Sequence, residues 1–210
     1  GPPGPAVAEK RPAKITELEA GVFYVDVARI SEVDFATALP ELAAARGMVF
    51  DFRGYPSLPP AFLGHLSRQP LRSGQGHVPS ITLPDRQDFR FTRLEEWELP
   101  PAAPFLPAKK AFIVDGRAIS YAETCLAIVE RYELGEIVGA PSAGTNGNAT
   151  TFSLPGGYTV AWTGMKYLKH DGSRHHGVGV HPTIPVSRTR AGIVAGRDEL
   201  LERAVLAVKD

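Results

Sequence analysis

A serine between a turn and a helix is the residue of this sequence best placed for covalent chemistry. In residues 115–123 (DGRAISYAE), Ser120 follows the turn residues Asp115-Gly116 and begins a predicted helix. The amino end of a helix presents unpaired amides and a positive dipole, which stabilise a serine alkoxide or a nearby oxyanion. Ser120 and Glu123 also fit the capping box S-x-x-E, so the local pattern leaves both a nucleophile and an ordinary helix cap open.

Side chains that could take the proton from such a serine lie further along the chain. Four of the six histidines occur close together, at His170, His175, His176 and His181. His175 or His176 could act as base or orienting group, or the cluster could bind a metal. A polar hairpin surface explains the histidines equally well, and neighbours on a strand face opposite sides, so both cannot aim at one site. Lys166 could serve as base if burial lowered its pKa.

Two units of alternating strand and helix must position these residues. In the first, a strand over residues 21–28 (GVFYVDVA) precedes a helix capped by Ser31 with Asp34. Gly47 ends this helix, Pro40 is expected to kink it, and a buried strand over residues 48–52 follows.

The second unit carries Ser120. It consists of a strand over residues 111–114, a helix over residues 120–132 and a strand over residues 136–138. The order strand, helix, strand predicts a right-handed parallel crossover.

The remaining segments give weaker patterns. Residues 53–107 are rich in proline, with short candidate elements only at residues 61–66 and 89–93. Further strands are predicted at residues 158–162 and 165–170, with a hairpin turn at Asp171-Gly172, and a final helix at residues 198–208.

Composition limits the class of protein. The chain has 210 residues, 43% of them hydrophobic, which suits one globular domain. We expect a linker over residues 1–18, joined to an upstream region, and a core domain over residues 19–210. The formal net charge is zero, so a nucleic-acid partner is not indicated. The single cysteine, Cys125, excludes a disulfide within the chain. No apolar run is long enough to span a membrane, and no signal peptide is evident, although one could precede this segment.

Several blocks of sequence, taken in order, resemble the tail-specific or C-terminal processing serine peptidases. Residues 115–123 resemble the nucleophile segment, residues 50–56 (FDFRGYP) the segment DLRGNP, and residues 138–144 (VGAPSAG) the segment VGEPTxG. Residues 163–182 echo the later strand, turn and G-x-G-x-x-P segments. Agreement in order covers roughly residues 20–207.

The resemblance implies a fold, a reaction and a set of site residues. The fold would be α/β, a Clp-protease/crotonase-like core of stacked βα units with a C-terminal β-hairpin and final helix. Ser120 would be the nucleophile, and the amides of Gly54 and Tyr121 would form the oxyanion hole. The substrate would be a peptide or unfolded protein, no cofactor is needed, and the location would be extracytoplasmic. Oligomeric state cannot be read from the sequence.

A groove for an extended peptide would lie beside the Ser120 helix. Asn146 and Asn148 could hydrogen-bond such a peptide, although loop asparagines often only form turns. The other expected groove residues are Arg53, Tyr55, Gly144 and Thr145.

The sequence departs from the family pattern at the general base. The family's lysine matches Thr145, which cannot accept the serine proton, so a Ser-Lys dyad is not available. In the tricorn-like branch a histidine from an upstream segment serves instead, and that is our leading explanation. Two alternatives stay open: a catalytically inactive member that binds peptides or other ligands, and a crotonase-like enzyme acting on acyl thioesters.

Overall fold

A computed structural model of the chain describes residues 10–81, 83–85 and 87–209. Its centre is a six-stranded sheet in the order β1-β2-β3-β8-β9-β13. These strands are β1 (Ile15–Glu19), β2 (Val22–Asp26), β3 (Gly47–Asp51), β8 (Lys109–Val114), β9 (Glu136–Gly139) and β13 (Ile184–Pro185). The edge strand β1 is antiparallel to β2, and all other neighbours are parallel. The predicted α/β class with a parallel sheet is therefore confirmed.

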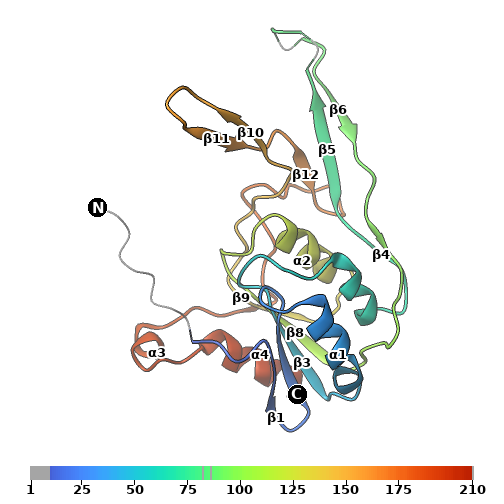
Figure 1. Cartoon of the computed structure of the whole chain (residues 1–210), viewed down its shortest axis with the longest axis vertical. Helices are drawn as coiled ribbons and strands as arrows, with labels where there is room; N and C mark the ends of the chain where they lie inside the picture. Colours follow the sequence, from blue (N-terminus) through green and yellow to red (C-terminus); the bar gives the residue numbers. More distant parts are fainter. Residues whose placement is uncertain (1–9, 82, 86, 210) are drawn as a thin grey trace.

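Helices cover both faces of this sheet (Figure 1). One face packs against α1 (Glu32–Ala43), the 3-10 helix η1 (Pro60–Leu66) and α2 (Tyr121–Arg131). The opposite face packs against α4 (Glu199–Lys209), which follows the short helix α3 (Arg190–Val194). The molecule is thus a three-layer arrangement with α2 and its amino end on the first face.

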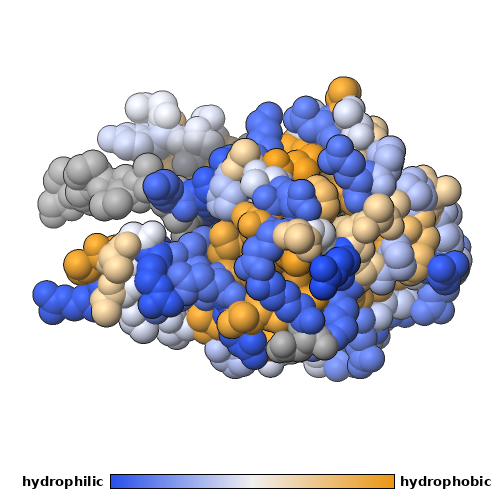
Figure 2. Space-filling model, turned by 90° about the horizontal axis from the view of Figure 1, so that it is seen from below, coloured by the Kyte–Doolittle hydropathy of each residue, from blue (hydrophilic) through white to orange (hydrophobic). Residues whose placement is uncertain are grey.

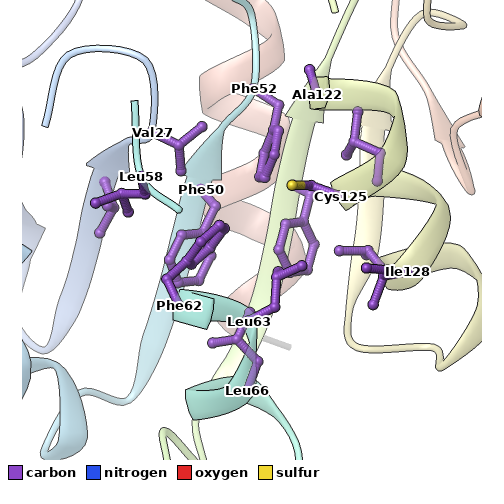
Figure 3. Close-up of a cluster of buried hydrophobic side chains, with 14 of the residues drawn as sticks. Val27, Phe50, Phe52, Leu58, Phe62, Leu63, Leu66, Ala122, Cys125 and Ile128 are labelled. Carbon is purple, nitrogen blue, oxygen red and sulfur yellow. The ribbon is translucent and has the colours of Figure 1, made fainter. Parts of the chain in front are cut away.

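Successive side chains along a strand point to opposite faces of the sheet, so the hydrophobic core is divided into two clusters, one on each face. In β3, Phe50 packs toward α2 and η1, whereas Val49 packs toward α4. Figure 3 shows side chains from β3, η1 and α2 meeting in the larger cluster, among them Phe50, Phe62 and Cys125. Burial raises the pKa of the Cys125 thiol to about 12, so this cysteine is a packing residue and not a reactive thiol.

The first predicted unit is present in the structure. Ser31 caps α1, its hydroxyl accepting from the Asp34 amide at 3.1 Å, and Pro40 lies inside the helix. The strand β1, however, was not predicted. Residues 15–18 were expected as linker, but Ile15 pairs with Val25 in the sheet, so the linker must end before residue 15. The expected linker residues 1–9 lie outside the described residues.

The second unit also matches the prediction. The strands β8 and β9 are parallel, with Ile113 opposite Val138, and α2 connects them. The carboxyl end of β8 therefore leads through a turn directly into the amino end of α2, which is where Ser120 lies. The final helix α4 agrees with the predicted one to within a residue at each end.

Two β-hairpins project from the core on the same side of the molecule (Figure 1). In the first, β5 (Gln75–Ser80) pairs with β6 (Arg90–Arg93) and with β12 (Lys166–Leu168). The second consists of β10 (Thr150–Ser153) and β11 (Thr159–Trp162) as a separate two-stranded sheet. A further small pair, β4 (Leu71–Arg72) with β7 (Glu98–Leu99), lies at the base of β5 and β6. At the predicted turn, Gly172 has a positive φ of 81° and Leu168 bridges Arg174.

The surface opposite the hairpins is of mixed character. Figure 2 shows hydrophobic residues emerging in several places between hydrophilic ones on the face seen from below. Of the helices within residues 10–81, 83–85 and 87–209, none combines the length and apolar character needed to cross a membrane.

Candidate active site

Ser120 lies in a tight turn between β8 and α2. The turn is built by Asp115, whose carboxylate accepts from the backbone amide of Arg117 at 2.9 Å and whose carbonyl accepts from Ala118. The Ser120 amide donates to the Thr145 carbonyl at 2.8 Å, which ties the turn to the loop after β9. This contact brings the nucleophile segment and the residue at the matched lysine position together.

The backbone of Ser120 is strained. Its φ is 51° and its ψ is −113°, a conformation that residues with a side chain rarely adopt. Such outliers cost of order 1–3 kcal/mol and cluster at functional sites. A strained turn between a strand and a helix is also how other serine hydrolases expose a nucleophilic hydroxyl. Ser120 is half-buried, and its φ and ψ differ from the extended conformation that Ser31 adopts at the cap of α1, so the strain is not explained by an ordinary helix cap.

The buried Glu123 carboxylate holds the site together. Its Oε1 accepts from the Ser142 hydroxyl at 2.5 Å and from the Gly144 amide at 2.7 Å. Its Oε2 accepts from the amides of Thr145 at 2.8 Å and Ser120 at 3.3 Å. The predicted capping box of Ser120 and Glu123 is therefore present, but the carboxylate binds mainly the loop of residues 142–145. That loop is thereby fixed against the amino end of α2.

The pKa of Glu123 lies below its ordinary value. Burial opposes ionisation, but the contacts from His175 and Ser142 outweigh it. His175 Nε2 lies 3.4 Å from Glu123 Oε2, within ion-pair range. His175 is fully buried, and neither ring nitrogen finds a well-formed hydrogen bond among the described residues. His175 thus lies behind the loop, beside Glu123, and its ring contacts Tyr167 edge-on at 5.4 Å.

A pocket of about 290 Å³ opens beside Ser120. Its volume suits one large side chain or a short peptide segment. The residues that line it are Tyr55, Ser73, Gly74, Gly76, Leu94, Glu95, Trp97, Ser120, Tyr121, Thr124, Asn146, Gly147, Asn148, Met165 and Tyr167. The nucleophile candidate therefore faces a cleft with aromatic walls and polar groups near the serine.

Five of the residues singled out in the sequence meet at this pocket: Ser120, Tyr121, Tyr55, Asn146 and Asn148. The rings of Tyr55 and Tyr121 are 5.8 Å apart, and the Tyr121 hydroxyl donates to the Leu58 carbonyl. Tyr121 is the first residue of α2, where backbone amides have no partner within the helix. Asn146 is buried and donates to the Thr124 hydroxyl at 2.9 Å.

Gly54 and Arg53 are not among the residues that line the pocket. The Gly54 amide donates to the Phe52 carbonyl at 2.8 Å, so in this structure it is engaged within its own turn. The Arg53 side chain is buried and makes a bidentate ion pair with Asp198, with bonds of 2.8 and 2.7 Å. Arg53 therefore braces the core, and its side chain is not part of the pocket wall.

The remaining expected residues also lie outside the pocket wall. The Gly144 amide binds Glu123, and the Thr145 side chain is exposed. His176 Nε2 accepts from the Tyr167 amide at 3.1 Å, and the Lys166 ammonium lies over the Phe91 ring at 4.5 Å. In the described part of the chain, no three His, Cys, Asp or Glu side chains are placed to hold a metal.

Several pocket residues were missed at the level of sequence. Trp97 and Leu94 come from the proline-rich segment, and Met165 and Tyr167 from the strand β12 and the turn before it. The Trp97 and Tyr121 rings are 5.8 Å apart, so the segment that gave no clear pattern forms one wall of the pocket. Glu123 was noted only as a cap partner, although its burial could have been expected from the apolar residues around it in α2.

Solved structures share this fold. A candidate peptidase from Parabacteroides merdae superposes with a TM-score of 0.75 at 16% identity, covering 93% of this chain and 64% of that chain. Mature CPAF complexed with lactacystin gives 0.70 at 14% identity, covering 90% and 51%. The photosystem II D1 C-terminal processing protease gives 0.53 at 18% identity, covering 79% and 42%. This chain thus spans about two fifths to two thirds of these chains, and identities this low establish the fold alone.

The family assignment comes from the sequence. A search of curated proteins finds no significant match. The model of peptidase family S41 matches residues 82–186, half of the chain. The chain belongs to peptidase family S41, which confirms the resemblance to the tail-specific and C-terminal processing peptidases.

Proposed function

We propose that this chain is the catalytic domain of a serine endopeptidase or C-terminal processing peptidase that cleaves peptide bonds through an acyl-enzyme on Ser120. The observation that carries the proposal is the strained, half-buried Ser120 at the amino end of α2, opening into an aromatic-walled pocket. A crotonase-like core is part of the same proposal, since the βα units and the helix-opening serine suit it.

The reaction follows from the groups at the pocket. The Ser120 Oγ attacks the carbonyl carbon of a bound peptide while a base removes the hydroxyl proton. The tetrahedral oxyanion accepts a hydrogen bond from the Tyr121 amide at the positive end of α2. The proton then passes to the amine, which leaves, and water hydrolyses the ester to regenerate Ser120. The Gly54 amide becomes the second oxyanion donor if substrate binding turns it away from the Phe52 carbonyl, to which it donates here.

The described residues that line the pocket do not supply the general base. No histidine or lysine is among the described residues that line the pocket. His175 is fully buried beside Glu123. This position favours a role as an orienting group over a role as a base that exchanges protons with solvent. We therefore propose as the base a histidine from outside this 210-residue chain, as in the tricorn-like branch.

Fluorophosphonate labelling tests the proposal directly. We expect the full-length protein to be labelled, and labelling to disappear in Ser120→Ala. Ser73→Ala is the matched control, because Ser73 lines the same pocket and should leave labelling unchanged. Labelling of the full-length protein but not of this 210-residue chain would support a base outside it. Equal labelling of wild type and Ser120→Ala would exclude Ser120 as the nucleophile.

A binding protein without catalysis is the second candidate. The observation that favours it is Thr145 at the matched lysine position, with its carbonyl hydrogen-bonded to the Ser120 amide. Because residue 145 is so close to Ser120, a lysine there could reach the serine hydroxyl. If the full-length protein is not labelled but binds peptide, Thr145→Lys should restore labelling, and Thr145→Gln should not.

A further inference from the structure

The hairpin of β10 and β11 has one apolar face with no partner in the described structure. In its register, Phe152 is opposite Val160 and Thr150 is opposite Trp162, so these side chains share one face. Thr151, Ala161, Ser153 and Thr159 form the other face, which is polar or small. The exposed large hydrophobic residues of the hairpin and its tip are Phe152, Leu154, Tyr158, Val160 and Trp162.

Such a face is unusual for a hairpin standing in water. Every residue of both strands is exposed, and Tyr158 at the tip is 72% exposed. An isolated two-stranded sheet is marginally stable, and a contiguous apolar surface marks an interaction site. The Phe152 and Trp162 rings meet edge-on at 5.4 Å, which offers a preformed aromatic surface.

The hairpin is joined to the wall of the Ser120 pocket. Asn148, just before β10, and Met165, just after β11, both line that pocket. The Asn148 amide is 3.0 Å from the Met165 sulfur, which closes the base of the hairpin. A polypeptide held in the pocket would therefore leave it beside the hairpin.

The charge of the segment indicates what kind of chain it would hold. Residues 142–165 contain no Asp, Glu, Lys, Arg or His, whereas the neighbouring β6 carries Arg90 and Arg93. An uncharged aromatic face selects apolar side chains and tolerates varied sequence around them. An extended, unfolded polypeptide presents such side chains, and a folded substrate buries them.

We infer that the apolar face of the β10–β11 hairpin docks apolar side chains of an extended polypeptide substrate, several residues away from the bond held at Ser120. The inference rests on the proposed function and extends it to the substrate class. Phe152 lies four residues beyond Asn148, roughly 13 Å along a strand, and Leu154 roughly 20 Å. A bound peptide therefore needs about four to six residues on one side of the reacting carbonyl to reach this face.

Fluorescence anisotropy with the full-length Ser120→Ala protein tests the inference without requiring cleavage. The probe is a fluorescein-labelled 12-residue peptide of serine and glycine with leucine at alternate positions. We expect it to bind at least about tenfold more weakly to a protein that also carries Phe152→Thr and Trp162→Thr. A four-residue version should bind both proteins equally. Thr151→Ser with Thr159→Ser, on the opposite face, is the matched control and should leave binding unchanged.

The outcomes separate the docking surface from the catalytic proposal. Fluorophosphonate labelling of Ser120 in the full-length protein should be equal with and without the Phe152 and Trp162 substitutions, because the small probe does not reach the hairpin. If labelling occurs but the long peptide binds both proteins equally, the docking surface is excluded and the peptidase proposal stands. If labelling fails but the hairpin substitutions still weaken peptide binding, the docking surface stands without catalysis.

Two other occupants would overturn the inference. A concentration-dependent dimer in sedimentation, abolished by the Phe152 and Trp162 substitutions, would assign this face to a second copy of the chain. Co-sedimentation with phosphatidylcholine vesicles that is lost on the same substitutions, with unchanged peptide binding, would assign it to a lipid surface.

Discussion

Ser120 is held in its strained conformation by bonds to its neighbours. Its amide is engaged by the Thr145 carbonyl and the Glu123 carboxylate, and Thr124 returns a hydrogen bond to its carbonyl at 3.0 Å. These bonds fix both peptide planes next to the residue. The hydroxyl is then presented toward the pocket by a backbone that a free chain would avoid.

Replacement of Ser120 by glycine should therefore relieve this strain. We expect Ser120→Gly to be more stable than Ser120→Ala by about 1–2 kcal/mol, because glycine adopts a positive φ without steric cost. Urea denaturation of the two variants measures the difference. Neither variant has a hydroxyl, so both should be unlabelled by fluorophosphonate. A Ser120→Ala protein as stable as Ser120→Gly would show that the turn is not strained in solution.

Glu123 acts through the residues that it holds, as a positioning residue. Glutamine has one acceptor oxygen and an amide group that would face donors from Ser142, Gly144 or Thr145. We expect Glu123→Gln to lose at least about 2 kcal/mol in the free energy of unfolding, since hydrogen bonds to a charged group contribute most when buried. Glu130 lies on the same helix, and its ion pair with Lys169 is only partly buried, so Glu130→Gln should cost less than Glu123→Gln.

The rate of fluorophosphonate labelling distinguishes a positioning role of Glu123 from a purely stabilising one. Under conditions where Glu123→Gln is folded, we expect its rate of labelling at Ser120 to fall at least about tenfold, with unchanged peptide affinity. A labelling rate equal to that of wild type would mean that Glu123 only stabilises the fold.

At the scale of elements, the end of β9 sets the course of the loop that carries Gly144 and Thr145. Gly139 has a φ of 131°, and a Cβ there would collide with the Val114 carbonyl oxygen of β8. The Ala140 amide donates to that same carbonyl at 3.0 Å. The tight approach of the two parallel strands therefore depends on a residue without a side chain.

Gly139→Ala should be strongly destabilising for this reason. We expect a loss above about 2 kcal/mol, because the new methyl group meets backbone and the φ is unfavourable for alanine. Thermal unfolding followed by circular dichroism measures it. Gly116→Ala is the matched control, since a Cβ there meets nothing within 4 Å, and it should change stability by less than about 0.5 kcal/mol. Equal effects of the two substitutions would contradict the assigned strand contact.

The two βα units could be predicted from the sequence, and most of the pocket could not. Residues 21–52 and 109–139 carry apolar runs, a capping box and turn signals that act locally, so β2, β3, β8 and α2 appear where expected. Leu94, Trp97 and Tyr167 reach the pocket through long-range pairing of short strands. Elements were expected at residues 89–93 and 165–170, but their pairing with β5 could not be predicted from local patterns. The strain at Ser120 was likewise invisible, since it arises from bonds to the distant residue Thr145.

At the scale of the whole molecule, a buried charge network joins elements distant in sequence. Asp51 at the end of β3 accepts from Arg53 at 2.6 Å and from the Tyr24 hydroxyl at 2.7 Å, and Arg11 lies 3.8 Å away. Arg53 continues the network to Asp198 before α4. The network thus ties β2, β3, the chain before β1 and α4 into one body.

Asp51 should make the stability of the protein fall in acid. Burial opposes its ionisation, but the hydrogen bonds and charge of Arg53 hold the pKa of the carboxyl below its ordinary value. A carboxyl whose pKa is lower in the folded protein than in the unfolded chain stabilises the fold at pH values above the unfolded pKa, near 4. This stabilisation is lost as the pH falls through the folded-state pKa. We therefore expect Asp51→Asn to cost about 3–5 kcal/mol at pH 7, where it leaves Arg53 without its closest carboxylate.

The pH dependence of the free energy of unfolding tests the role of the charge better than a measurement at pH 7 alone. Many substitutions of a buried residue destabilise a protein at any single pH, whatever their cause. The free energy of unfolding of Asp51→Asn should fall less steeply than that of wild type between pH 5 and lower pH. If Asp51→Asn instead runs parallel to wild type through this range, the pKa of Asp51 is the same in the folded and unfolded protein, and its charge does not stabilise the fold.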